Sequence, residues 1–173
     1  MKRLDKLDWF LAALSILDKE SFSKITIDNL CSKLNVTKGS FYHHFGNIEG
    51  FIDAFMAYIL EKKALDYMKK ADKEQNLEKR LDLIRLMGFV SDYNVAHKIR
   101  AWSYSNEIVK KYLDQIDEIR LEYLVRLRVL KGESKEDAEI KSRIDYALLV
   151  GLQQLYPKLS RNELDKLYRV YKE

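Results

Sequence analysis

Apolar residues recur at steps of three and four along most of the chain, the spacing that places them on one face of an α-helix. No alternation of apolar and polar residues persists long enough to predict a β-strand, and the 173 residues include one proline and six glycines. The first helical stripes are Leu4, Leu7, Leu11 and Leu14, followed by Ile27, Leu30, Cys31 and Leu34. The pattern predicts an all-α fold.

Capping residues mark where the next helices begin. Thr26 precedes the short second helix and Thr37 a third, and threonine is a favoured N-cap residue. The third helix carries Phe41 and Phe45 four positions apart, on the side that we expect to face inwards. Asn47 is expected to cap a long fourth helix that couples the N-terminal part of the chain to the rest.

The remainder of the chain predicts five more helices. Residues 69–76 are polar and are expected to form a linker, whereas residues 77–92 are apolar on almost every side and are expected to lie in the centre of a bundle. Gly132 and Pro157 are helix-end signals, and Ser160-Arg161-Asn162-Glu163 is a capping box that opens the last helix. The other three predicted helices cover 94–104, 108–130 and 140–155. The expected fold therefore has nine helices.

The composition adds limits on compartment. Apolar residues make up 47% of the chain and charged residues 34%, as in globular proteins with a packed core. A single cysteine, Cys31, excludes an internal disulfide, fits a reducing compartment and is expected to be a buried small residue. No apolar run approaches the roughly 20 residues of a membrane span, and no signal-peptide core is evident. A cytoplasmic protein without a membrane partner is expected.

Charge alone does not predict the partner. The formal net charge is +4, and the first 50 residues hold seven Lys and Arg against six Asp and Glu. An anionic partner is therefore permitted but not required by electrostatics.

Residues 26–45 predict a helix, a short turn at Asn35 and Val36, and a second helix. This arrangement matches the helix-turn-helix, whose second helix enters the DNA major groove by its N-terminal end. In the segment VTKGSFYHHF, residues 36–45, Thr37, Gly39 and Ser40 lie at the N-terminal end of the second helix. The free backbone amides of a helix start bind phosphate favourably, and glycine allows close approach to them. Tyrosine and histidine side chains left outside can hydrogen-bond phosphates or base edges.

VTKGSFYHHF, with ITIDNLCSKLN before it and GNIEGFIDAFM after it, resembles the DNA-binding region of TetR-type transcriptional regulators. The matching positions are Thr26, Val36, Thr37, Gly39, Ser40, Phe41, Tyr42, His44 and Phe45. Later segments are similar more loosely, in the order IRAW at 99–102, a long helix with Tyr123, and ALLVGL at 147–152. The resemblance implies a nine-helix TetR-like fold, with a DNA-binding domain over 1–46 and a ligand-binding and dimerisation domain over 47–173.

The resemblance also implies a function. The expected protein is a homodimeric regulator that binds a pseudo-palindromic double-stranded DNA operator, with a repressor favoured over an activator. A small-molecule effector of unknown identity is expected to release it, and no cofactor is implied. One departure is Ile48, where the family often has a lysine that meets a phosphate. Loss of one such contact is expected to lower the slope of log DNA affinity against log salt concentration by about one unit. The residues expected to face DNA are Thr26, Thr37, Lys38, Gly39, Ser40, Tyr42, His43 and His44.

The paired histidines, His43 and His44, admit three interpretations. Metal ligation needs further convergent ligands, which the neighbouring sequence lacks, and a catalytic base needs a pocket, which a short surface helix does not supply. Contact with DNA is favoured for His44, whereas His43 is expected at the rim.

The effector is expected to bind among aromatic and polar residues of the central helices. The alternative for each of them is an ordinary core residue whose polar tip is satisfied within the fold. His97 and Arg100 stand out, because polar groups beside an apolar core need partners. The candidates are Tyr93, His97, Arg100, Trp102, Tyr104, Tyr112 and Tyr123.

The last two helices carry a broad apolar face that something must cover. Ala147 and Gly151 lie four apart and allow a second helix to approach closely, so a two-fold interface is favoured over packing within one chain. The expected interface residues are Ile140, Ile144, Ala147, Leu148, Gly151, Leu152, Leu155, Leu164, Leu167 and Tyr168.

Two other classes of protein are alternatives to a DNA-binding regulator. A helical protein-interaction module of the same fold, without DNA or ligand binding, is the alternative that Ile48 and the mild charge support. An enzyme is not expected, because no nucleophile–base pair, paired Glu/His metal motif or phosphate loop appears in the sequence.

Overall fold

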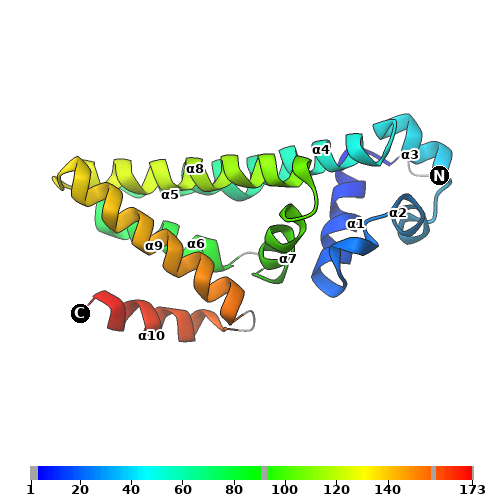
Figure 1. Ribbon diagram of the computed structural model, residues 1–173. Helices are drawn as coiled ribbons and strands as arrows, with labels where there is room; N and C mark the ends of the chain where they lie inside the picture. The colour runs from blue at the N-terminus through cyan, green and yellow to red at the C-terminus, as the bar shows by residue number, and fades with distance from the viewer. Residues whose placement is uncertain (1–3, 91–92, 157–158, 173) are drawn as a thin grey trace. The chain divides into compact units, whose positions relative to one another are not determined.

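The computed structural model describes the backbone of residues 4–90, 93–156 and 159–172, with most of their side chains. Every regular element in these ranges is helical (Figure 1). The elements are α1 (Lys6–Lys19), η1 (Phe22–Lys24), α2 (Ile27–Leu34), α3 (Lys38–Phe45), α4 (Ile48–Leu60), η2 (Glu61–Leu65), α5 (Asp66–Ala71), α6 (Leu77–Val90), α7 (Tyr93–Ser103), α8 (Glu107–Leu130), α9 (Lys135–Leu155) and α10 (Arg161–Lys172).

The all-α prediction is confirmed. α4, η2 and α5 follow one another without a break and form one continuous helix. The described residues therefore hold nine helices besides the three-residue 3-10 turn η1, as expected. In these same ranges none of the helices has the length and hydropathy that crossing a bilayer requires.

The chain divides into two compact units. The first comprises Met1–Leu60 and Asn94–Asp114, and the second comprises Glu61–Tyr93 and Gln115–Glu173. The division into a DNA-binding domain over 1–46 and an effector domain over 47–173 is a functional one and stays a prediction.

The interior of the first unit is aromatic. Trp9 of α1 lies edge-on to Phe41 of α3, with 5.4 Å between ring centroids, and Phe41 lies 5.7 Å from Phe51 of α4. Phe51 in turn stacks on Phe55 at 5.8 Å. All four rings are fully buried, and such pairs add to the free energy gained by burying their area. Contacts of this kind join α1, α3 and α4.

The buried side of α1 is not the leucine stripe. Leu7 and Leu11 are 45% and 51% exposed. The opposite stripe has the same helical period but holds the two large aromatic rings, which bury more area, and two alanines, which allow close packing. The buried residues of α1 are Trp9, Phe10, Ala12, Ala13, Ile16 and Leu17.

The first unit also includes α7. Lys98 donates from Nζ to the carbonyl oxygens of Leu17, at 2.6 Å, and Asp18, at 3.0 Å, at the C-terminal end of α1. A cation at this end of a helix is stabilised by the exposed carbonyls. Trp102 stacks on Phe22 of η1 with 6.0 Å between ring centroids. These contacts explain why residues 94–114 cluster with the N-terminal residues.

The long helix α4–η2–α5 contains a π-helical segment, η2. Phe51, Ile52, Phe55, Met56 and Ile59 are the buried positions before it, and Ala64, Met68 and Ala71 are those within and after it. The helix runs to Ala71, so the first three residues of the expected linker, 69–71, are helical instead. Met68 and Ala71 belong to the core of the second unit, which explains why the helix continues that far.

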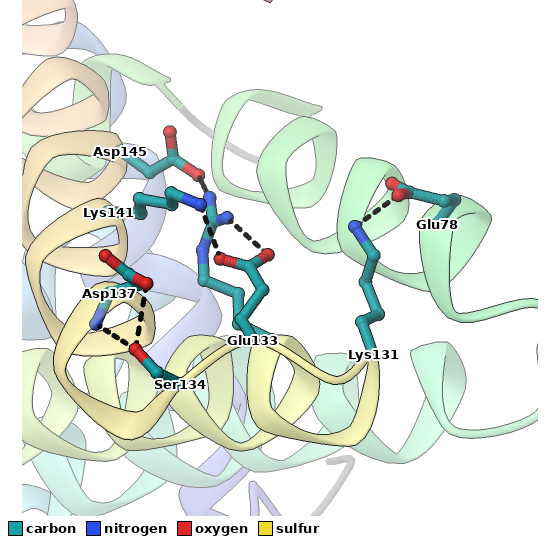
Figure 2. Close-up of polar contacts among 8 residues, drawn as sticks. Glu78, Lys131, Glu133, Ser134, Asp137, Lys141 and Asp145 are labelled. Carbon is teal, nitrogen blue, oxygen red and sulfur yellow. Dashed lines mark hydrogen bonds and ion pairs between the residues drawn. The ribbon is translucent and has the colours of Figure 1, made fainter.

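The interior of the second unit contains ion pairs. Arg128 of α8 and Asp145 of α9 are 6% and 3% exposed, and the guanidinium donates to the Asp145 carboxylate at 2.5 Å. Arg128 also donates to Glu133 at 3.2 Å, and Lys141 donates to the other oxygen of Glu133 at 3.0 Å. Figure 2 shows this network at the corner between the two helices, beside the ion pair of Lys131 with Glu78.

Helix α8 ends just before Gly132, as the sequence predicts. Gly132 has a φ of 95°, which lies in the left-handed region that glycine occupies without strain. Ser134 then caps α9 by accepting from the Asp137 amide at 3.1 Å. The capping box of α10 is also confirmed, because the Ser160 amide donates to Glu163 at 2.8 Å.

Candidate nucleic-acid interface

The turn between α2 and α3 is closed by backbone hydrogen bonds. The Val36 amide donates to the Cys31 carbonyl at 3.0 Å, and the Asn35 amide to the Ser32 carbonyl at 3.2 Å. Asn35 has a φ of 53°, and asparagine adopts this left-handed conformation more readily than most residues. Asn35 therefore serves as the helix-ending residue, a place that glycine often takes.

Both predicted caps that flank this motif are confirmed. Thr26 accepts from the Asn29 amide at 3.2 Å at the start of α2, and Asn47 accepts from the Gly50 amide at 2.7 Å at the start of α4. The prediction for Thr37 is wrong in one respect. It occupies the N-cap position of α3, but in the described structure its side chain accepts no capping hydrogen bond. The threonine hydroxyl therefore leaves the first amides of α3 without a capping side chain.

Helix α3 is anchored on one side. Phe41 is fully buried, and Phe45 is half-buried with its ring centroid 5.9 Å from that of Trp9. His44 is half-buried as well, at 6.1 Å from Trp9. The structure thus confirms the inner side predicted for Phe41 and Phe45, and it places His44 partly on that side.

The other side of α3 is open to solvent. Lys38 and Gly39 are exposed, as are Tyr42, at 50%, and His43. Ser40 is half-buried, whereas Thr26 and Thr37 are exposed at the helix starts.

Of the two histidines of α3, His43 is exposed and His44 is half-buried. In the described residues no three His, Cys, Asp or Glu side chains converge as a metal site.

Two glycines on this motif differ in what surrounds them. A Cβ built on Gly50 of α4 would lie 2.3 Å from the Phe45 carbonyl oxygen, so close packing of α4 on α3 requires glycine there. A Cβ on Gly39 would meet only the Thr37 hydroxyl oxygen, at an ordinary 3.6 Å. Glycine in a helix costs about 0.5–1 kcal/mol relative to alanine. Packing within the chain does not explain Gly39.

Lys38 has a partner that the sequence pattern does not predict. Its Nζ lies 2.5 Å from a carboxylate oxygen of Asp28, in the first turn of α2. Both side chains are more than half exposed. The hydrogen bond to Asp28 and its charge raise the pKa of Lys38, so the lysine stays protonated. The two residues are ten positions apart on different helices, so helical spacing does not predict their contact. The turn between α2 and α3 brings the two charges together.

Ile48 is half-buried at the start of α4. The side chain at the departure from the family pattern is therefore partly enclosed by the fold.

The predicted effector residues divide between the two units. In the first unit, Trp102 stacks on Phe22, Tyr104 is 88% exposed and Tyr112 hydrogen-bonds Asp53. His97 and Arg100 are half-buried. His97 Nδ1 is enclosed without a hydrogen-bond partner among the described residues. The side chain of Tyr93 lies outside the described residues.

Tyr123 lies in the second unit and lines a pocket of about 340 Å³. Its hydroxyl donates to Asp72 at 2.7 Å, and the Arg126 guanidinium lies 4.9 Å from its ring centroid. Burial, followed by the hydrogen bond to Asp72, raises the pKa of Tyr123 to about 12. The lining is Leu65, Met68, Lys69, Asp72, Ile119, Glu122, Tyr123 and Arg126.

The predicted dimer residues fall mainly on one open face of α9. Ile140 and Ile144 are about half exposed and Leu155 is 73% exposed, whereas Leu152 is buried within the chain. A Cβ at Gly151 would meet nothing within 4 Å. Ala147 is exposed, Leu148 and Gly151 are half-buried, and Leu167 of α10 is 43% exposed. The side chains of Leu164 and Tyr168 lie outside the described residues.

Residues 11–55 match the family model of bacterial regulatory proteins of the tetR family. No protein of curated function matches the sequence of this chain. Solved structures match it at low sequence identity. A Rhodococcus sp. protein described as a TetR-family transcriptional regulator superposes with a TM-score of 0.73 and 13% identity, over 98% of both chains.

Two further structures give the same result. PfmR, a TetR-family transcriptional regulator from Thermus thermophilus, has a TM-score of 0.68 and 18% identity, over 92% of this chain and 93% of that one. Salmonella enterica GusR has a TM-score of 0.69 and 20% identity, over 92% of this chain and 85% of that one. At these identities the likeness shows the fold. Residues 11–55 therefore match the tetR family of bacterial regulatory proteins, and the chain has the TetR-family fold over nearly its full length.

Proposed function

We propose that the protein is a homodimeric transcriptional repressor that binds a pseudo-palindromic operator through α3 and is released by a small-molecule effector. The observation that carries the proposal is the division of α3 into two sides. Phe41 holds the helix to the aromatic interior, while Thr37, Lys38 and Tyr42 stand open at and near its N-terminal end. An N-terminal edge of this kind is what a helix-turn-helix inserts into the major groove.

Gly39 supports the same proposal. It stands in the first turn of α3, and no atom of the described residues requires the absence of a side chain there. A glycine at a helix start lets an external phosphate approach the free backbone amides. We expect the Gly39 backbone to lie against DNA in the complex.

The experiment is a fluorescence polarisation titration against fragments of the host genome at low and moderate salt. Tyr42→Ala is expected to weaken binding to the best fragment by about fivefold to a hundredfold, the range for loss of one base or phosphate contact. Tyr104→Ala, which removes a still more exposed tyrosine from the turn after α7, is the control and is expected to bind as the wild type does. If no fragment competes better than random DNA, the regulator proposal fails and the helical interaction module takes its place.

The apolar face of α9 supports the homodimer. Exposed Ile140, Ile144 and Leu155 form a stripe that would be costly to leave in water. A two-fold pair would place two copies of α3 on successive major grooves, about 34–36 Å apart or a multiple of that spacing.

Gly151 tests this interface. Gly151→Arg is expected to give monomers in sedimentation velocity runs, because the long side chain projects where a partner helix approaches. Gly151→Ala has room within the chain and serves as the control, which is expected to remain dimeric. A dimer that persists in the arginine variant would place the interface elsewhere.

The pocket at Tyr123 supports an effector. Its apolar residues, among them Leu65 and Met68, are joined by charged side chains, which suits a small molecule with an apolar body and a polar group. Such a ligand lowers operator affinity only by binding more tightly to a state that holds the two recognition helices at the wrong spacing. A thermal-shift screen tests this proposal, with Leu65→Arg as the variant expected to lose the shift of any ligand found.

A further inference from the structure

The charge that α3 presents is neutralised within the chain. Lys38 is the first residue of α3 and the cation of its exposed N-terminal turn, and its Nζ lies 2.5 Å from the Asp28 carboxylate. The lysine and aspartate side chains are 59% and 71% exposed. A phosphate that approaches Lys38 therefore meets a carboxylate in the same place.

We propose that Asp28 is a positioning residue that limits the affinity of this surface for DNA, by holding Lys38 and by repelling phosphate. The inference rests on the proposed function and adds to it the residue that sets the strength of phosphate binding. Neither helical periodicity nor the family pattern assigns a role to Asp28.

The Asp28 carboxylate and a DNA phosphate compete for one cation, Lys38. An exposed ion pair is worth a factor of about five at most, so DNA can displace Asp28 from Lys38. The displaced carboxylate then stays close to the phosphate, because α2 and the turn at Asn35 fix its backbone position. The pair brings no net charge to the DNA, whereas Lys38 alone would bring one positive charge.

Salt dependence provides the specific signature. Each phosphate neutralised by the protein adds about 0.9 to the slope of log affinity against log salt. Removal of the Asp28 charge should therefore steepen this slope by about one unit, and a change in helix stability alone would not.

The test compares Asp28→Asn, which is isosteric and neutral, with the wild type on a random-sequence duplex of about 30 base pairs, between about 50 and 200 mM salt. The expected result is affinity about three to ten times higher at the low-salt end, with the steeper slope. Asp114→Asn is the matched control, because it removes the same charge from an equally exposed pair with Lys110 on α8. If this control raises affinity as much, the effect is one of net charge and the inference is overturned.

A double-mutant cycle shows whether Asp28 acts through Lys38. In a Lys38→Met background, Asp28→Asn is expected to leave the salt slope unchanged and to raise affinity by less than half the original factor. Equal effects in both backgrounds would contradict the inference. Weaker binding by Asp28→Asn would show that the carboxylate makes a favourable contact with DNA, which also overturns it.

Different results would contradict the role of Asp28 and the proposed function. If the wild type selects a genomic fragment but Asp28→Asn changes neither affinity nor slope, the role of Asp28 alone is wrong. If the wild type prefers no fragment over random DNA, the proposed function fails, and the random-duplex titration still decides whether Asp28 limits phosphate binding. Absence of binding to the duplex by both proteins would overturn the inference about Asp28, and the titration against genomic fragments alone decides the proposed function.

Discussion

The two compact units differ in what fills their interiors. In the first, buried rings such as Trp9, Phe41 and Phe51 contact one another across three helices. In the second, Arg128 and Asp145 form a buried ion pair beside the apolar core. The first interior is held by area and shape, and the second also depends on paired charges whose geometry must be right.

The difference has an energetic consequence. Burial of an aromatic ring is favourable wherever the ring fits, so a loss there costs area and leaves a cavity. A buried ion pair is close to neutral when compared with two apolar residues, but removal of one partner leaves a charge without compensation. The two units should therefore respond differently to single and double substitutions.

The largest expected effect is in the aromatic interior. Phe51→Ala removes a fully buried ring and is expected to lower the free energy of unfolding by about 3–5 kcal/mol. Both tryptophans, Trp9 and Trp102, lie in the first unit, so fluorescence during urea unfolding reports on that unit, while circular dichroism reports on both. A fluorescence transition that stays at the wild-type urea concentration would contradict the stated role of the ring.

The ion pair should show the opposite pattern. Asp145→Ala is expected to cost about 3 kcal/mol, because Arg128 would then be buried with Glu133 as its one remaining ion-pair partner among the described residues. The double variant Arg128→Met with Asp145→Leu is expected to come within about 1 kcal/mol of the wild type. Circular dichroism in urea measures both. If the double variant is as unstable as the single one, shape rather than charge pairing dominates this interior.

Close packing in the first unit extends to the backbone at the corner of α3 and α4. Gly50→Ala is expected to cost about 1–3 kcal/mol, because the new Cβ would overlap the Phe45 carbonyl oxygen. Gly39→Ala is the matched substitution in α3, where there is room, and is expected to stabilise the chain by up to about 1 kcal/mol. Thermal unfolding compares the two. Equal changes would mean that the corner relaxes more easily than its contacts indicate.

The smallest expected effect concerns pH in the second unit. The pKa of Tyr123 is raised from 10.0 to about 12, so below pH 10 the phenol is protonated in the folded and unfolded states alike. As pH rises from 10 towards 12, the unfolded state loses this proton first and stability falls. Tyr123→Phe should remove part of this alkaline loss at a cost of about 1 kcal/mol near neutral pH. Tyr146→Phe, which also has a raised pKa, serves as the comparison, and an unchanged alkaline transition in both would contradict the assignment.

Helical periodicity predicted the elements well but not always their buried sides. In α1, the stripes with Leu7 and with Trp9 obey the same period, and the sequence does not reveal which one meets another helix. The buried side of α3 was easier to predict, because Phe41 and Phe45 are its two phenylalanines and stand four positions apart, and both rings face Trp9.

The sequence does not predict which charged residues from different helices form ion pairs. Asp28 and Lys38 meet only because the turn at Asn35 brings the start of α3 back towards α2, and Arg128 meets Asp145 only after the chain reverses at Gly132. Surface charges occur on every helix of this chain, so no local signal separates a paired charge from a solvated one. The exposed edge of α3 was predictable, and the carboxylate that neutralises it was not.

The π-helical turn of η2 changes the spacing of buried positions along the long helix. In an uninterrupted α-helix, the position after Ile59 on the same side would be residue 63, four places later. Ala64 is the next buried residue instead, five places after Ile59, and steps of four and three then lead to Met68 and Ala71. The wide turn thus accommodates one more residue between two buried positions than an ordinary α-helical step of four does.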